Sequence, residues 1–133
     1  MANTMCVSLK CEVKKIFNKD LTKPVFKQIK DTIEPMINKT KGLVFDKNCK
    51  DGWELTATVV SLNADNPDNP TKLDASVSIT GMSFDQSPRT INATGEGKVP
   101  DVRLKTLEAD AKALVGGVFK DLMEKRVIPA LTK

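Results

Sequence analysis

The sequence predicts an α+β domain whose strands and helices follow the order β-α-β-β-β-α. Four stretches alternate apolar and polar side chains with a period of two, which is typical of strands with one buried face. Two longer stretches repeat apolar side chains at helical spacing. Because each predicted strand has one polar face, we expect a largely antiparallel four-stranded sheet with two helices packed on one face.

The length and composition agree with one soluble domain over residues 1–133. Of the 133 residues, 40% are hydrophobic and 29% are charged, as in ordinary globular proteins. No apolar run approaches the roughly 18 residues that a membrane span requires. The first residues lack the basic and apolar regions of a signal peptide. A cytoplasmic location is therefore the default expectation, and a mature exported form without its signal would have the same appearance.

The first strand and the first helix follow from the beginning of the chain. The strand places these alternating residues on one face: Val7, Leu9, Cys11 and Val13. The helix is expected over residues 23–39, with Thr22 as its N-cap and Pro24 in its first turn. Pro35 inside this helix predicts a kink or an early end near Glu34. The segment 43–45 is too short to classify.

Three further strands and a second helix complete the prediction. The strands are expected over residues 53–62, 72–80 and 91–99, with a turn at 85–88 before the last of them. The second helix is expected from about Leu104 to Ile128, ended by Pro129. Gly116 and Gly117 predict a bend within it, because glycine weakens a helix interior.

Three cysteines cannot all be paired within one chain. On a common strand, Cys6 and Cys11 would lie roughly 17 Å apart and on opposite faces, too far for a disulfide. Cys11 shares a face with apolar residues, so it is expected to be a core thiol. Cys49 lies between Asn48 and Lys50 and is expected to be exposed, where it could pair with another chain, although an unreactive surface thiol is the simpler expectation.

The sequence predicts a protein that is not an enzyme and holds no cofactor or metal. It contains no histidine, which excludes Ser-His and Cys-His catalysis and the commonest zinc ligand. Phosphate-binding loops of the GxGxxG and Walker types are absent. Trp53, the single tryptophan, is expected to fill one end of the core.

A loop of turn-forming residues is the first candidate for contact with a partner. It consists of Asp65, Asn66, Pro67, Asp68, Asn69 and Pro70. Two carboxylates and two amides could also bind Ca²⁺, but the loop lacks the central glycine and terminal glutamate of an EF-hand loop. A solvated turn, stiffened by its prolines, is the simpler interpretation.

A second candidate surface is basic. Lysines are dense between residues 10 and 30, where they favour a solvated face or a contact with phosphates or anionic lipid. The order helix, three strands, helix and the stretch Thr94-Gly95-Glu96-Gly97-Lys98 resemble the double-stranded RNA-binding domain. The resemblance implies anion contact by Lys98, Arg103 and Lys105, although the compact lysine run of that family is absent here. Nucleic acid is therefore not the expected partner.

The second helix points to self-association or to an unknown protein partner. Residues 114–119 include no polar side chain, so a neighbouring helix or a second subunit should cover this segment. Gly95 and Gly97 share the core face of the last strand, where either a helix approaches closely or a small apolar ligand binds. The sequence thus favours a non-catalytic interaction or oligomerisation domain, with an RNA-binding-like module and an apolar-ligand binder as alternatives.

Overall fold

A computed structural model describes residues 4–84 and 88–133. Its sheet has five strands in the order β2-β1-β3-β4-β5. The strands are β1 (Met5–Val13), β2 (Leu43–Phe45), β3 (Trp53–Ala64), β4 (Leu73–Ser83) and β5 (Thr90–Val99). Most of the turn expected at 85–88 lies outside the described residues. The short segment that the sequence left unclassified is strand β2.

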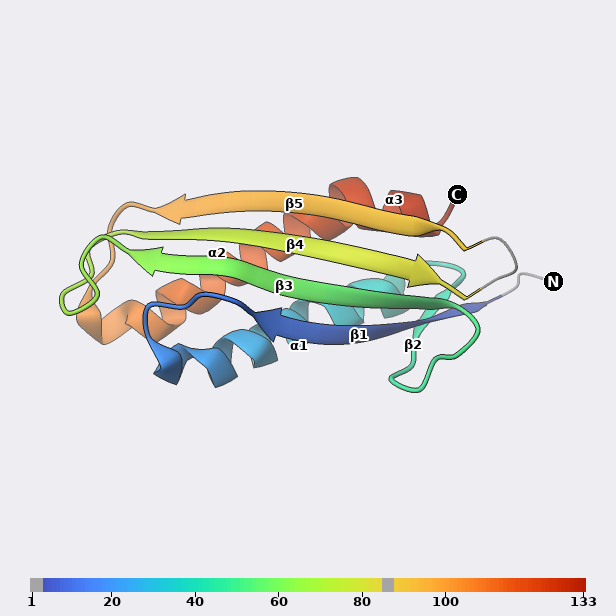
Figure 1. The fold of residues 1–133 in the computed structure, drawn as a ribbon, viewed down its shortest axis with the longest axis horizontal. Coiled ribbons are helices and arrows are strands. Elements are labelled where there is room, and N and C mark those ends of the chain that lie inside the picture. The colour runs from blue at the N-terminus through green and yellow to red at the C-terminus, as the bar shows by residue number, and fades with distance from the viewer. Residues whose placement is uncertain (1–3, 85–87) are drawn as a thin grey trace.

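The sheet is mixed, so the prediction of a largely antiparallel four-stranded sheet was wrong in part. Strand β1 runs parallel to both β2 and β3, whereas β4 is antiparallel to its neighbours β3 and β5. Figure 1 shows the arrows of β1, β3 and β5 pointing one way and that of β4 the other. The connection from β1 to β3 passes through a helix, and such a crossover returns the chain in the same direction.

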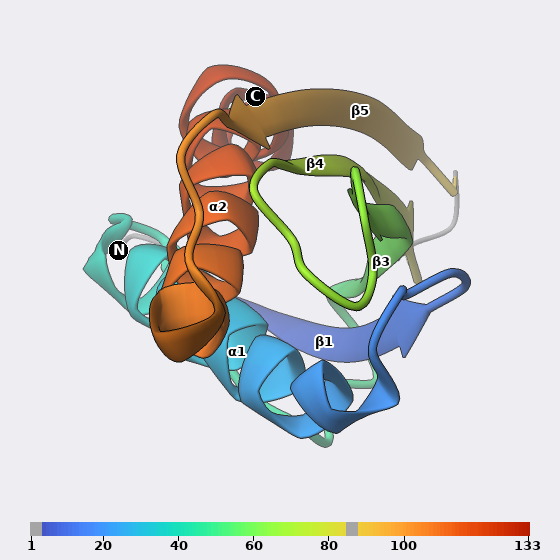
Figure 2. The ribbon, with the colours of Figure 1, turned by 90° about the vertical axis from the view of Figure 1, so that its left-hand side faces the viewer.

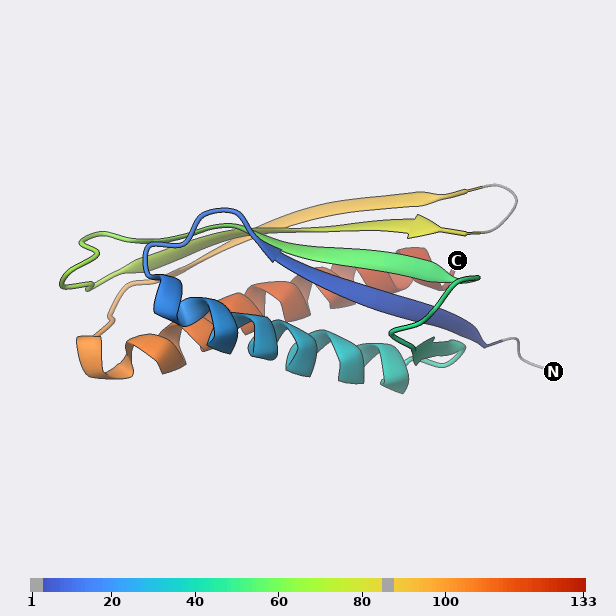
Figure 3. The ribbon, with the colours of Figure 1, turned by 60° about the horizontal axis from the view of Figure 1, so that its bottom comes forward.

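Two long helices cover one face of the sheet, as the sequence predicts. They are α1 (Thr22–Lys39) and α2 (Leu107–Leu122), and they lie side by side beneath the strands (Figure 3). Figure 2 shows the sheet curving around them. None of the described helices has the length and apolarity that a membrane span requires.

Helix α1 ends at Lys39 as predicted, but it begins without the predicted Thr22 cap and does not end early near Glu34. A 3₁₀ turn (Lys19–Leu21) precedes it, and the side chain of Asn18 accepts a hydrogen bond from the Asp20 N–H at 3.0 Å. The chain therefore enters the helical region one turn earlier than a Thr22 cap would allow. At the other end, the helix continues through Pro35 to Lys39, because Pro35 removes only one main-chain hydrogen bond.

The second helical region is longer and less regular than expected. After a 3₁₀ turn (Leu104–Thr106), α2 passes through Gly116 and Gly117 without interruption. A π-helical segment, η3 (Met123–Val127), follows, and α3 (Ile128–Leu131) continues beyond Pro129. The irregularity thus falls just before the proline, which has no N–H to donate to the preceding turn.

One continuous core fills the space between the sheet and the helices. Its largest fully buried side chains include Trp53 and Phe119, and Trp53 occupies the position that the sequence predicts. The alternation along β3 is interrupted once, by a bulge at Val60, between Val59 and Ser61.

Candidate functional site

Strand β5 forms one edge of the sheet, and no described strand pairs with its outer side. It is ten residues long, and its register with β4 runs from Thr90 to Val99 without a bulge. The opposite edge strand, β2, has only three residues. An unpaired edge of this length is a template for pairing with another strand, and natural proteins usually blunt such edges.

A groove of about 600 Å³ runs between β5 and the second helical region. Its walls are contributed by Gly95 and Gly97 of β5, Gly117, Val118 and Leu122 of α2, and Lys125 and Arg126 of η3, among others. The groove is open to solvent. A lining that combines apolar side chains with charged groups is typical of a recognition surface.

The glycines of β5 allow α2 to approach the sheet closely. A Cβ atom at Gly97 would lie 2.6 Å from Cγ2 of Val118 and 2.9 Å from Cδ1 of Leu114. One at Gly95 would lie 3.0 Å from Val118. Val118 therefore fills the space above both glycines, where a small apolar ligand was the alternative expectation. A Cβ at Gly117 would meet no atom within 4 Å, so the groove is open at that point.

The charges around the groove are only partly paired. Asp121 and Lys125 form an ion pair at 2.8 Å on one wall. On β5, Glu96 and Lys98 are exposed, and neither takes part in an ion pair among the residues that the structure describes. Lys98 lies directly opposite Asp74 of β4 without forming an ion pair with it, and Glu96 lies opposite the neutral Ser76.

The predicted partner loop connects β3 to β4 and is ordered by its own hydrogen bonds. The Asp65 carboxylate accepts the main-chain N–H groups of Thr71 at 2.9 Å and Lys72 at 3.0 Å, as well as the Thr71 hydroxyl. These hydrogen bonds hold the pKa of Asp65 well below its usual range, and the bond from the Thr71 hydroxyl makes the largest contribution. The Asn66 side chain accepts the N–H of Asp68 at 3.0 Å. The loop is exposed except for its last residue, Pro70, which is buried.

The basic residues expected to contact anions are not gathered into one site. Lys98 lines the groove, but Arg103 and Lys105 lie on the connection between β5 and α2, outside the groove. Within the lysine-rich region, Lys10 pairs with Glu54 at 3.6 Å, and Lys27 pairs with Asp31 at 2.8 Å.

Most of the apolar segment 114–119 is covered within the same chain. Helix α1 packs against α2, and the side chain of Gln28 lies so close to Gly116 that a Cβ there would be 2.9 Å from its amide nitrogen. Val115 and Phe119 are fully buried. The first helix thus supplies the cover that the sequence assigned to a helix or a second subunit, and Gly117 and Val118 are the members of the segment that line the groove.

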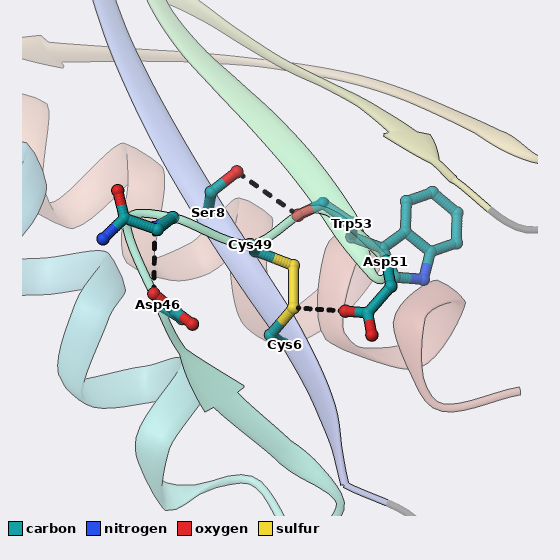
Figure 4. The surroundings of a disulfide bond; sticks show 7 residues. Cys6, Ser8, Asp46, Cys49, Asp51 and Trp53 are labelled. Carbon is teal, nitrogen blue, oxygen red and sulfur yellow. Dashed lines mark hydrogen bonds between the residues drawn. A yellow bond between two sulfur atoms is a disulfide. The ribbon is translucent and has the colours of Figure 1, made fainter.

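Cys6 and Cys49 form a disulfide (Figure 4), so the expectation of an exposed, unpaired Cys49 was wrong. Cys49 is buried, and it belongs to the connection between β2 and β3. The bond ties this connection to β1. The Asp51 carboxylate lies 3.2 Å from the Cys6 sulfur. These three residues are the one cluster of potential metal ligands in the described part of the chain, and disulfide formation removes both thiolates from it.

The sequence offered no signal for this pairing. The 43-residue separation of the two cysteines becomes a Cα–Cα distance of 5.6 Å because β1 and β3 are parallel neighbours. The groove was signalled in part, since Gly95, Gly97 and Lys98 were noted from the sequence. The wall that α2 contributes could not be predicted from the sequence, because spacing along the chain does not reveal which turn of a helix faces a strand edge.

Comparisons with known proteins identify the fold and no family. No family model matches the chain, and no curated protein does. The hypothetical protein CT253 from Chlamydia trachomatis is similar in structure, with 9% identity over 97% of each chain and a TM-score of 0.57. A PelC dodecamer from Paraburkholderia phytofirmans covers 92% of this chain and 93% of its own at 12% identity, with a TM-score of 0.48. A minor lipoprotein from Acinetobacter baumannii covers 96% and 90% at 16% identity, with a TM-score of 0.45. The likeness to CT253 shows the fold alone.

Proposed function

We propose that this protein is a non-catalytic interaction domain that binds a protein partner through the free edge of β5 and the adjoining groove. The observation that carries the proposal is the length of the unpaired edge beside an open, glycine-lined surface. A strand added to an exposed edge gains main-chain hydrogen bonds, and adjacent pockets select its side chains.

The chemistry of the groove supports binding over catalysis. Its lining includes no histidine and no cysteine. The carboxylate of Asp121 is already paired with Lys125. An active site would require a general base or nucleophile held beside a second polar group in a water-excluding cavity. The groove is instead open to solvent.

The disulfide supports function in an oxidising compartment. Such bonds persist in secreted and periplasmic proteins and are rare where thiols are kept reduced. Of the two locations considered from the sequence, we therefore favour the exported form.

Site-specific photo-crosslinking in the native host tests the proposed function. A photoreactive residue replaces Thr94, which is exposed on β5 at the groove, and a matched variant carries it at Lys23, an exposed position on α1. Irradiation is expected to give a discrete heavier adduct with the Thr94 variant and none with the Lys23 variant. Adducts at neither position, or equally at both, would show that the β5 edge is not a specific contact surface.

A further inference from the structure

We propose that the occupant of the β5 edge is β5 of a second copy of this chain. The two strands would pair antiparallel about a two-fold axis at Gly97 and join two five-stranded sheets into one. This inference rests on the proposed function and names its partner. A two-fold dimer is the commonest form of self-association, and it places the same surface patch on both sides of the interface.

The shape of the sheet favours self-pairing of β5 over contact with the other edge. A head-to-tail arrangement would place β5 against β2, which offers only three residues. Pairing β5 with itself about Gly97 joins residues 95–99 of both strands, which is five residues on each side against the three that β2 offers. Pro100 follows the strand and has no main-chain N–H, so the paired segment ends just beyond Val99.

Charge selects the register. Residues directly opposite each other in an antiparallel pair point to the same face of the sheet. A two-fold axis perpendicular to the sheet must therefore pass through a residue of β5 and not between two residues. An axis at Gly97 places Glu96 opposite Lys98 of the partner subunit, and it does so twice. Both side chains are exposed and form no ion pair within the described chain, although Lys98 has Asp74 opposite it on β4.

The neighbouring registers are less favourable. An axis at Glu96 would place Glu96 opposite Glu96 of the partner subunit, and an axis at Lys98 would oppose two lysines. Like charges directly opposite each other destabilise a strand pair. An axis at Gly95 would pair the charges with neutral residues, Thr94 and Asn92. Of these registers, the one about Gly97 places Glu96 and Lys98 each opposite a residue of opposite charge in the partner subunit.

The groove accepts the other face of the added strand. In the same register, Val99 of the partner subunit lies opposite Gly95, on the face that looks toward the helices. Gly95 has no side chain, and Val118 and Leu122 lie beside it in the lining of the groove. Val99 is only half-buried in the single chain, so pairing would bury further apolar surface.

Charge-reversal variants test this register. Multi-angle light scattering and sedimentation are expected to show a dimer for the disulfide-bonded wild-type protein. E96K alone and K98E alone each place like charges opposite twice, and each is expected to weaken dimerisation at least tenfold (about 1.4 kcal/mol). An equimolar mixture of the two variants restores opposite charges at every position, so it should form a heterodimer. The double variant E96K/K98E should dimerise as the wild type does.

Lys105→Glu is the matched control. It makes the same charge change as K98E at an exposed position outside the groove, and its dimerisation should equal that of the wild type. Circular dichroism checks that each variant is folded.

Three results would overturn the inference, and they separate it from the proposed function. The dimer is ruled out if the wild-type protein stays monomeric up to about 1 mM, where the free energy of association would be weaker than about −4.1 kcal/mol. A dimer unaffected by E96K and K98E, or a mixture that does not associate, rules out this register. A Thr94 adduct whose mass corresponds to another protein would uphold the edge as a contact surface but reject the second copy as its occupant.

Discussion

Asp65 shows how one exposed carboxylate can order a loop. Its oxygens accept two main-chain N–H groups and one hydroxyl from Thr71 and Lys72, across the gap between the end of β3 and the start of β4. Such hydrogen bonds favour the charged form of the carboxyl group. Two of the four side chains that suggested a cation site from the sequence, those of Asp65 and Asn66, thus accept hydrogen bonds from the loop itself.

The low pKa of Asp65 predicts a pH-dependent contribution to stability. In the folded chain the pKa lies below the ordinary value of 3.8, so the contribution is complete above that value and is lost as the pH falls through the folded pKa. Asp65→Asn should be less stable than the wild type at neutral pH, and the difference should shrink as the pH is lowered below about 4. Urea denaturation of both proteins across this range measures it. A difference that is constant with pH would exclude the charge as its cause.

At the scale of elements, α1 tolerates a proline that the sequence predicts to disturb it. Pro35 is exposed, so its ring meets solvent, and the helix loses the hydrogen bond that would reach the Asp31 carbonyl. The buried positions on either side, Ile33 and Ile37, pack into the core and hold the last turns in place. Tertiary packing therefore outweighs local propensity here.

Replacing Pro35 should stabilise the protein. Pro35→Ala restores a main-chain donor and raises helix propensity, and part of the gain is offset by a more flexible unfolded chain, which leaves about 1–3 kcal/mol. Chemical denaturation measures the change, with Lys30→Ala on the same helix as a control that should be near neutral. If Pro35→Ala lowers the free energy of unfolding, the proline ring contributes packing that outweighs the missing hydrogen bond.

The sequence predicts the elements better than their arrangement. Period-two alternation identified the strand around Val77 and Ile79 and its buried face, because alternation reflects burial directly. Alternation carries no information about strand direction, so the parallel pairing of β1 with β3 was missed. The groove depends on the close approach of Val118 to Gly97, which the spacing of residues within one element does not reveal.

At the scale of the molecule, the disulfide cross-links the parallel part of the sheet, because it joins β1 to the connection between β2 and β3. It closes a long loop that contains most of β1, all of α1 and β2. Cys11, the remaining cysteine, is not bonded, and burial raises the pKa of its thiol, so it is a poor competitor for disulfide exchange at neutral pH.

Reducing the disulfide should lower the stability of the whole protein. Cross-linking restricts the unfolded chain, and removal of such a bond costs roughly 2–4 kcal/mol. Cys6→Ser/Cys49→Ser should therefore unfold at a lower urea concentration than the wild type. Cys11→Ser should change this midpoint little, and a reductant should shift the wild type but not the double variant. Equal midpoints for all three proteins would show that the bond does not contribute to stability.

The same bond also determines how the chain carries mechanical tension. A pull on the N-terminal end of the described chain enters at Met5 and passes through the sulfur bridge directly to the segment before β3, at the centre of the sheet. Residues 7–48 are bypassed and remain unstretched while the bridge is intact. Reduction would release this segment, and the 43 residue-to-residue steps from Cys6 to Cys49, at roughly 3.5 Å each, give roughly 150 Å of extension.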